Sequence, residues 1–314
     1  MSLAFLFPGQ GSQAVGMGLD LAAAFPAARE VFQEVDDALG QPLFKLMSQG
    51  PEEELTLTEN AQPALMAVSM AVVRVLERDF GVGIDRAAFV AGHSLGEYSA
   101  LAAAQAFTLA DTARLLKLRG LAMQRAVPVG QGAMASLIGP KTDVALAETA
   151  AAAGADVGVC VVANDNNAGN VVISGDKAGV DRAIEKAKEL GARAILLNVS
   201  APFHCPLMQP AADEMAQALA AAVIVAPRTP LVANVTARPV HDPDTIRRLL
   251  VEQVTGRVRW RESVTWLADG GGVTRFAELG AGKVLTGMAK RTVPDAPAAA
   301  LNTPADIEAF ASSL

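Results

Sequence analysis

The Gly-His-Ser-Leu-Gly segment at residues 92–96 constrains the fold of this chain more than any other feature. An apolar stretch at residues 87–91 precedes it, and an alanine-rich tract without a helix breaker follows it as far as Phe107. The pattern therefore predicts a strand, a tight turn and a helix. Glycines beside a turn serine let strand and helix pack closely and leave the hydroxyl of Ser94 exposed on a strained corner. N–H groups at the start of such a helix can stabilise an oxyanion.

The remaining periodicity predicts an α/β body around this turn. A buried strand is expected at residues 3–7, closed by a Pro-Gly-Gln-Gly-Ser-Gln turn. Apolar residues at helical spacing predict helices over 20–39, 60–79, 97–106, 109–126, 210–222 and 244–254, and further strands over 231–234 and 275–279.

The middle of the chain has a different predicted order of strands and helices. Strand, helix, strand, strand, helix and strand are predicted over 133–138, 142–153, 157–162, 170–174, 177–190 and 193–199, with a turn at 164–169 between the central strands. This β-α-β-β-α-β order is the ferredoxin-like arrangement. We therefore expect a small subdomain at 128–199, inserted into a larger one made of 1–127 and 200–314.

Composition excludes several classes of protein. The chain has 314 residues, 51% hydrophobic, with a net charge of −7, so no basic excess is available to bind nucleic acid. Two cysteines, Cys160 and Cys205, provide neither a disulfide framework nor a zinc-binding spacing, which predicts a reducing cytoplasm. No signal peptide and no membrane-spanning run is expected. Only residues 247–291 are locally basic, with nine basic and four acidic residues, which could attract an acidic partner or simply be a solvated face.

A serine nucleophile needs a base, and the chain has only three histidines. The side chain of His93 leaves the turn in a different direction from that of Ser94. His241 lies in a polar turn that predicts solvent exposure. His204 lies in an apolar loop bracketed by prolines, where the two subdomains rejoin, so we predict that it is the base.

The third member of a triad is missing from this region, because no Asp or Glu lies between Gly191 and Pro210. A backbone carbonyl could fix the tautomer of His204, and a dyad suffices for a thiolate leaving group. Helical context alone places Arg119 on the surface, although a pocket-facing guanidinium would bind a substrate carboxylate. Cys205 reads as a small buried residue and not as a nucleophile.

Taken together, these segments resemble the malonyl-CoA:acyl carrier protein transacylase family over essentially the whole chain. The matching motifs are Phe7-Pro8-Gly9-Gln10-Gly11-Ser12-Gln13, Gln62-Pro63-Ala64-Leu65, Gly92-His93-Ser94-Leu95-Gly96-Glu97-Tyr98, Arg119-Gly120 with Met123-Gln124, Pro202-Phe203-His204-Cys205-Pro206-Leu207-Met208, Gln253 seven residues before Trp260, and Glu278-Leu279-Gly280-Ala281-Gly282-Lys283-Val284-Leu285. The resemblance implies a hydrolase-like α/β body with a parallel sheet and an inserted ferredoxin-like subdomain.

The resemblance also implies a role for individual residues. Ser94 is expected to be the nucleophile and His204 its base, with the backbone N–H groups of Gln10 and Leu95 as the oxyanion hole. Arg119 is expected to hold the malonyl carboxylate, which reverses the surface interpretation, and the Gln253 carbonyl to orient His204. Pocket-lining positions are expected at Gln62, Asn164 and Phe203; phenylalanine before the histidine is typical of malonyl-selective relatives.

The implied activity is transfer of a malonyl group from malonyl-CoA to the phosphopantetheine thiol of acyl carrier protein, by a ping-pong mechanism through a Ser94 ester. No metal or resident cofactor, no nucleic acid and no membrane is expected, and the chain is expected to be a monomer. Alternatives are a malonyltransferase of a polyketide synthase or malonate decarboxylase system, a serine esterase, and a non-catalytic docking module.

Overall fold

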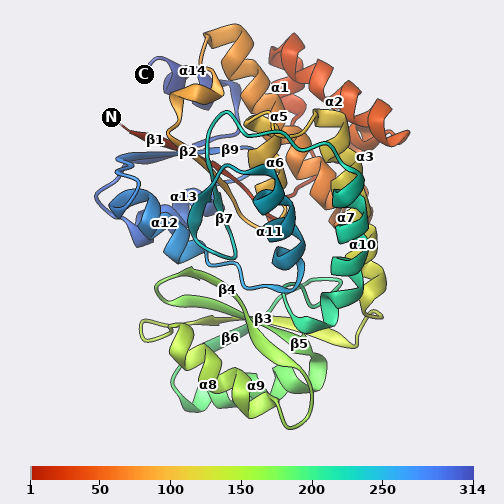
Figure 1. Cartoon of the computed structure of the whole chain (residues 1–314), viewed down its shortest axis with the longest axis vertical. Coiled ribbons are helices and arrows are strands. Elements are labelled where there is room, and N and C mark those ends of the chain that lie inside the picture. Colours follow the sequence, from red (N-terminus) through yellow and green to blue (C-terminus); the bar gives the residue numbers. More distant parts are fainter. Residues whose placement is uncertain (1) are drawn as a thin grey trace.

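The computed structural model describes residues 2–314 as two stacked parts, a large α/β body and a smaller layered unit (Figure 1). The elements follow the chain in this order: β1 (Leu3–Phe7), α1 (Leu19–Ala24), α2 (Pro26–Leu39), α3 (Leu43–Gln49), α4 (Glu52–Thr56), α5 (Thr58–Phe80), β2 (Phe89–Gly92), α6 (Gly96–Ala103), α7 (Leu109–Ala126), β3 (Gly132–Ile138), α8 (Val144–Gly154), β4 (Cys160–Asn167), β5 (Asn170–Asp176), α9 (Lys177–Glu189), β6 (Arg193–Leu196), α10 (Gln209–Ala221), β7 (Leu231–Ala233), β8 (Arg238–Val240), α11 (Pro243–Thr255), α12 (Trp260–Asp269), β9 (Arg275–Leu279), α13 (Val284–Thr292), β10 (Ala298–Leu301) and α14 (Pro304–Ala311).

The body is built on a sheet with the strand order β10-β9-β1-β2-β7-β8. Its strands pair in parallel, except that β8 pairs antiparallel to β7 at one edge. Every residue of β1 is buried, since helices cover both faces. Phe5 and Phe7 belong to the core beneath α5 and α6, whereas Ala4 and Leu6 belong to the core beneath α12 and α13. A parallel sheet covered on both faces explains why this strand reads as a continuous apolar run.

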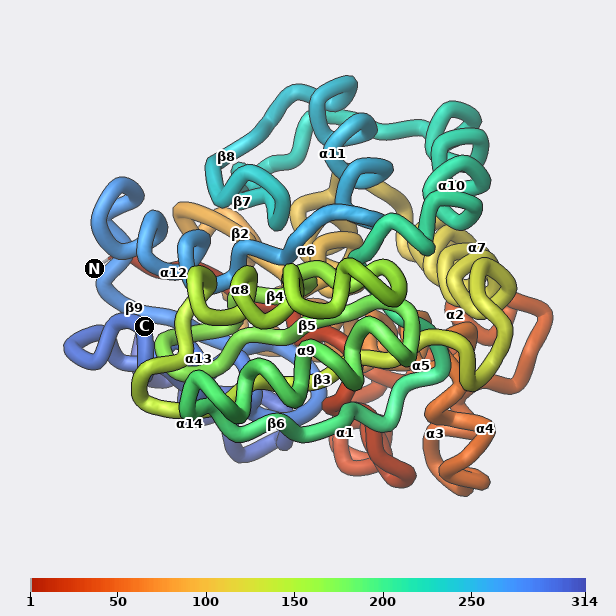
Figure 2. Tube along the Cα trace, turned by 90° about the horizontal axis from the view of Figure 1, so that it is seen from below, coloured from red at the N-terminus to blue at the C-terminus, as the bar shows by residue number. Residues whose placement is uncertain are grey.

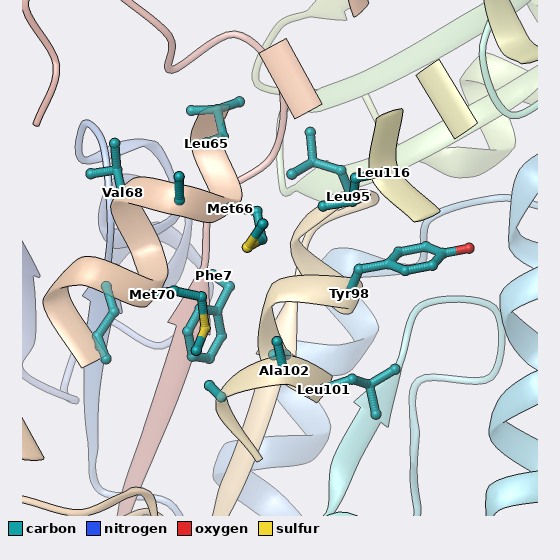
Figure 3. Packing of buried hydrophobic residues seen from close by; sticks show 14 of the residues in the cluster. Phe7, Leu65, Met66, Val68, Met70, Leu95, Tyr98, Leu101, Ala102 and Leu116 are labelled. Carbon is teal, nitrogen blue, oxygen red and sulfur yellow. The ribbon is translucent and has the colours of Figure 1, made fainter. Parts of the chain in front are cut away.

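The core on the α5 side fixes the helix that follows the serine turn. Figure 3 shows Met66 of α5 beside Leu95 and Tyr98 at the start of α6. Residues 96–103 of α6 are all buried, so this helix lies inside the body and cannot shift without disturbing the core.

The smaller unit is an antiparallel sheet with the strand order β4-β5-β3-β6. Helices α8 and α9 lie across its outer face (Figure 2), where they cover alternate residues of β3 such as Ala135 and Leu137. Met134, which directly precedes Ala135 and therefore points to the opposite face of the sheet, packs instead in the core of the body. With its two helices, this strand order is that of a ferredoxin-like unit, so the predicted fold class is confirmed.

Some sequence-based boundaries were wrong. The helix expected at 20–39 is two helices, because Phe25 is extended and Pro26 begins a new helix. The turn expected at 164–169 is shorter than predicted and comprises only residues 168–169. Strand β4 continues to Asn167, and its register against β5 shifts between Val162 and Asn164 and again between Asp165 and Asn167. An isolated parallel bridge joins Asn164 to Val258, which ties this strand to the body and satisfies the backbone of a polar segment that looked like a turn.

Candidate active site

Ser94 lies in a strained turn between β2 and α6. Its φ is 53°, in the left-handed region that costs a non-glycine residue about 1–3 kcal/mol. Both flanking glycines are required by space. A Cβ on Gly92 would lie 1.9 Å from the carbonyl group of Gly96, and a Cβ on Gly96 would lie 2.2 Å from the carbonyl oxygen of Phe7. The close approach of strand and helix therefore has the geometry that the sequence pattern predicts.

Asn234, at the end of β7, holds this turn in place. Its Oδ1 accepts a hydrogen bond from the N–H of Ser94 at 2.8 Å, and its Nδ2 donates to the carbonyl of Gly92 at 2.7 Å. The side chain is fully buried. Sequence reasoning missed this residue, and its one signal was a polar side chain directly after a buried strand.

The structure brings Ser94 and His204 together across 110 residues of sequence. The hydroxyl of Ser94 donates to Nε2 of His204 at 2.7 Å. On the other side of the ring, Nδ1 donates to the carbonyl oxygens of Gln253 at 2.9 Å and Gly256 at 3.1 Å. Two carbonyl acceptors require a proton on Nδ1, which leaves Nε2 free to accept the serine proton. These carbonyls occupy the place that a carboxylate has in a triad.

Burial and charge keep His204 neutral. The ring is 3% exposed, and its φ of 57° also lies in the left-handed region. Desolvation, with a smaller contribution from the positive charge of Arg119, lowers the pKa of His204 to about 3, against the opposing effect of the two carbonyls. At neutral pH the ring is therefore in the form that can take a proton from Ser94.

Arg119 points into the same site, so the interpretation of it as a surface residue was wrong. Its side chain is 1% exposed, because α7 packs with that face against the body. Nη1 donates to Oε1 of Gln62 at 2.8 Å, and Nη2 donates to Oε1 of Gln253 at 2.7 Å and to Ser94 Oγ at 3.2 Å. All three acceptors are neutral, and none of the ion pairs within residues 2–314 includes this guanidinium. The cation is therefore available to an anionic ligand.

The two residues whose backbone N–H groups are predicted to form the oxyanion hole, Gln10 and Leu95, line one cavity together with Ser94. Leu95 directly precedes α6, and Gln10 lies in the loop after β1. Among the hydrogen bonds within residues 2–314, neither of these N–H groups is a donor. Helix α5 holds the side chain of Gln10 in place, because Thr58 Oγ1 donates a hydrogen bond to its Oε1 at 2.9 Å. Thr58 Oγ1 in turn accepts a hydrogen bond from Nε2 of Gln62.

These groups line a cavity of about 320 Å³ between the body and the smaller sheet. Ser94, His204, Arg119 and both predicted oxyanion residues contact it, as do the three predicted pocket positions Gln62, Asn164 and Phe203. The smaller sheet closes the opposite wall with side chains such as Met134 and Val172. The site is therefore formed by both parts of the molecule.

The other residues considered from sequence lie elsewhere or are structural. His241 is exposed and outside the cavity, as predicted. The Cys205 thiol is fully buried and donates to the Pro202 carbonyl at 3.1 Å, and Cys160 is also free and buried. His93 lines the cavity, and its Nε2 lies 3.0 Å from Oδ1 of Asn166, a partner that the sequence did not suggest.

The basic segment at 247–291 is partly neutralised in the structure. Arg257, Arg259 and Arg261 pair with Glu148, Glu262 and Asp165. Around α13 the cations are exposed, and within residues 2–314 no ion pair includes Lys283, Lys290 or Arg291. Because α13 also supplies Val284, Leu285 and Met288 to the cavity wall, this positive charge lies beside the cavity.

The sequence and the fold both match known proteins over almost the full chain. Residues 4–305 match the family described as "Acyl transferase domain". A protein of Escherichia coli strain K12 named "Malonyl CoA-acyl carrier protein transacylase" is 47% identical over 307 residues, covering 98% of this chain and 97% of that protein. A relative with the same name in Bacillus subtilis strain 168 is 44% identical over 98% of this chain and 95% of its own length.

Solved structures give the same result. The acyl-carrier-protein S-malonyltransferase of Bartonella henselae is 54% identical, with a TM-score of 0.96 over 100% of this chain and 99% of its own. A malonyl-transacylase solved in complex with a type II polyketide acyl-carrier protein is 42% identical, with a TM-score of 0.96 over 100% of both chains. This chain therefore belongs to the acyl transferase family, in its group of malonyl-CoA:acyl carrier protein transacylases.

Proposed function

We propose that this chain transfers the malonyl group of malonyl-CoA to the phosphopantetheine thiol of an acyl carrier protein, and that it supplies fatty acid elongation. The observation that carries this proposal is a single cavity containing both a paired serine and histidine and a buried arginine that has no carboxylate partner. The serine pair fits acyl transfer, and the arginine fits an acyl group that ends in a free carboxylate.

In the first half-reaction, His204 Nε2 takes the proton of Ser94 as its Oγ attacks the thioester carbonyl. The Gln10 and Leu95 N–H groups stabilise the oxyanion, and losing one such donor typically costs about 2.7–4 kcal/mol. The tetrahedral intermediate collapses as the C–S bond breaks, and His204 returns the proton to the coenzyme A thiolate. Because that thiol has a pKa near 8.5, its departure needs little assistance.

In the second half-reaction, the phosphopantetheine thiol of the carrier enters the same cavity. Neutral His204 removes its proton, and the sulfur attacks the malonyl-serine ester through a second oxyanion. The C–O bond to Ser94 breaks and the serine regains its proton from His204. One thioester is exchanged for another, so no nucleotide, metal or resident cofactor is needed in this scheme.

Arg119 would hold the malonyl carboxylate by its guanidinium and thereby place the thioester carbonyl at Ser94 Oγ, to which Nη2 already donates. Phe203, with 8% of its surface exposed, adds an apolar wall that leaves little room for a branched acyl group. Limited space and the occupied guanidinium would also restrict water, which competes with the carrier thiol for the ester.

Two further proposals concern organisation. We take residues 128–199 as the small subdomain and 1–127 with 200–314 as the large one, which agrees with the two separate sheets. No helix within residues 2–314 is long and apolar enough to cross a membrane. The two free, buried cysteines fit a reducing compartment, and we propose a cytoplasmic monomer.

Intact mass spectrometry tests the activity directly. Incubation with malonyl-CoA should add one malonyl group to the wild-type chain, and subsequent addition of holo acyl carrier protein should remove it and load the carrier. Ser94→Ala should take up no malonyl group, and a persistent adduct on that variant would rule out Ser94 as the nucleophile. Arg119→Ala should lose its preference for malonyl-CoA over acetyl-CoA in a competition assay.

A second pathway is supported by one comparison, the polyketide complex described above. The same site would then load a polyketide carrier. Carrier proteins from fatty acid and polyketide systems, offered together to the malonylated enzyme, would separate the two assignments. A serine esterase, in contrast, should release acid from p-nitrophenyl acetate without transferring the acyl group to thiols.

A further inference from the structure

A buried carboxyl group lies directly behind the cavity and is not used in the mechanism above. Glu97, in the first turn of α6, is 1% exposed. Its Oε2 accepts a hydrogen bond from Nε2 of Gln253 at 2.7 Å. Burial raises the pKa of Glu97 to about 7, although the Gln253 amide, the Asn234 backbone and the positive charge of Arg119 act in the opposite direction. Burying a carboxyl group in such surroundings costs free energy of folding unless hydrogen bonds or a nearby opposite charge offset the loss of water.

Gln253 connects this carboxyl to both halves of the site. Its backbone carbonyl accepts from Nδ1 of His204 at 2.9 Å. Its side-chain Oε1 accepts from Nη2 of Arg119 at 2.7 Å, and its Nε2 donates to the backbone carbonyl of Ser94 at 2.9 Å as well as to Glu97. The side chain is fully buried, so water cannot replace these partners.

These contacts permit only one orientation of the Gln253 amide. An amide has a donor end and an acceptor end. The Glu97 oxygen and the Ser94 carbonyl both require the donor end on their side, which turns the acceptor end toward Arg119. A flipped amide would place its oxygen against two other oxygens and its NH₂ against the guanidinium. Removing the Glu97 acceptor weakens the preference for the observed orientation.

Burial lowers the pKa of Arg119, and the two neighbouring side chains Tyr98 and Glu97 act in the opposite direction by stabilising the charged guanidinium. Tyr98, the next residue of α6, has its ring 5.7 Å from the Arg119 guanidinium carbon. The first turn of α6 therefore supports Arg119 from behind, while the Nη atoms face the cavity and its amide partners.

We propose, on the basis of the function proposed above, that Glu97 is a positioning residue for the malonyl carboxylate, acting through the side chain of Gln253 to hold Arg119 in its binding orientation before the substrate arrives. It touches neither the substrate nor the reacting atoms. Its contribution should therefore appear in the binding of acyl groups that carry a carboxylate and be small for those that do not.

The experiment measures single-turnover loading of Ser94 with malonyl-CoA and with acetyl-CoA, followed by intact mass. Glu97→Ala should raise the malonyl-CoA concentration that gives half-maximal loading about tenfold, near the lower end of the effect of one lost charge-assisted hydrogen bond, with a much smaller effect on acetyl loading. Glu97→Gln keeps an oxygen acceptor and should recover part of the malonyl preference. Ser99→Ala is the matched control, because Ser99 is fully buried in the same helix and its hydroxyl has no partner within residues 2–314.

A double-mutant cycle tests the route of the effect. Gln253→Ala removes the side chain but keeps the carbonyl that orients His204, so it should lose malonyl preference as Glu97→Ala does. In that background, Glu97→Ala should add less than about twofold, because the two residues act in one chain of contacts. If Glu97→Ala fails to fold, Glu97→Gln and Gln253→Ala decide the question.

Unchanged malonyl preference in Glu97→Ala, or in Gln253→Ala, would overturn the proposal. So would an equal loss of malonyl and acetyl loading, which would mark a purely structural carboxyl, or independent effects in the cycle. These outcomes differ from a failure of the proposed function, in which the wild-type chain itself would take up no malonyl group.

Discussion

Replacing Asn234 with alanine should both destabilise the protein and slow the loading of Ser94. The variant leaves the N–H of Ser94 and the carbonyl of Gly92 without their partners in a fully buried place. A buried polar group without a partner costs about 1–3 kcal/mol, so the two together cost about 2–6 kcal/mol. The entropy of unfolding grows with chain length, so for 314 residues this corresponds to a fall in melting temperature of roughly 3–9 °C.

The same substitution should act on the chemistry, because the Asn234 bond helps to hold Ser94 at a φ of 53°. Relaxation of the turn would move Oγ away from Nε2 of His204, and a displacement near 1 Å can cost about a hundredfold in rate. Asn302→Ala is the control, since it removes a single side-chain bond, to the Gly282 carbonyl, away from Ser94. Thermal melts and the rate of malonyl uptake below the melting temperature measure the two effects. A melting temperature and a loading rate both equal to those of the control would refute the reasoning.

Three other predictions concern the base, the turn and the carrier. Because burial lowers the pKa of His204 to about 3, the rate of loading with acetyl-CoA should change less than about twofold between pH 7 and pH 5, whereas a histidine with a pKa of 6.5 would reduce that rate roughly 25-fold. A series of kcat/KM values against pH measures this, and a steep fall below pH 6.5 would contradict the lowered pKa. Gly96→Ala would place a Cβ 2.2 Å from the Phe7 carbonyl oxygen and should not give a folded protein. Gly287→Ala, with open space around its Cβ in α13, should raise the free energy of unfolding in urea by about 0.5–1 kcal/mol. Equal stability of the two variants would argue against the close packing of the turn. Reversing the charge of Lys283, Lys290 and Arg291 should raise the KM for the acidic carrier and leave the kinetics with malonyl-CoA unchanged. Steady-state assays that vary each substrate measure this, and they would show the opposite pattern if these cations instead bind coenzyme A.

Much of the architecture could be predicted from local patterns. The strand before Ser94, helix α7 and the alternation of strands and helices after Gly132 follow from periods of two and 3.6 residues, which one segment carries by itself. The predictions failed where a long-range partner overrides the local preference. Residues 164–167 carry a polar sequence typical of a turn, yet they form a strand because β5 and Val258 satisfy their backbone.

The candidate site likewise has one part that follows from local sequence and another that depends on long-range contacts. The serine turn is local, and its two glycines can be identified without knowing the rest of the fold. His204 could be predicted from its apolar loop between prolines, whereas only the resemblance to relatives indicated Arg119 and Gln253 as members of the site. The chemical roles of all three stay predictions. The supporting role of the residues that hold those groups could not be predicted from the sequence. Asn234 and Glu97 look like an ordinary strand end and an ordinary helix start until packing buries them against Ser94 and Gln253.

What the sequence determined by itself is the turn at Ser94, the two kinds of layered unit and the family, because these depend on the order and spacing of nearby residues. Only the tertiary structure decided how His204 meets the serine, which carbonyls orient its ring and which partners hold the Arg119 guanidinium. Those contacts join residues up to 159 positions apart. Their geometry depends on how whole helices and strands pack, which is information that no single segment contains.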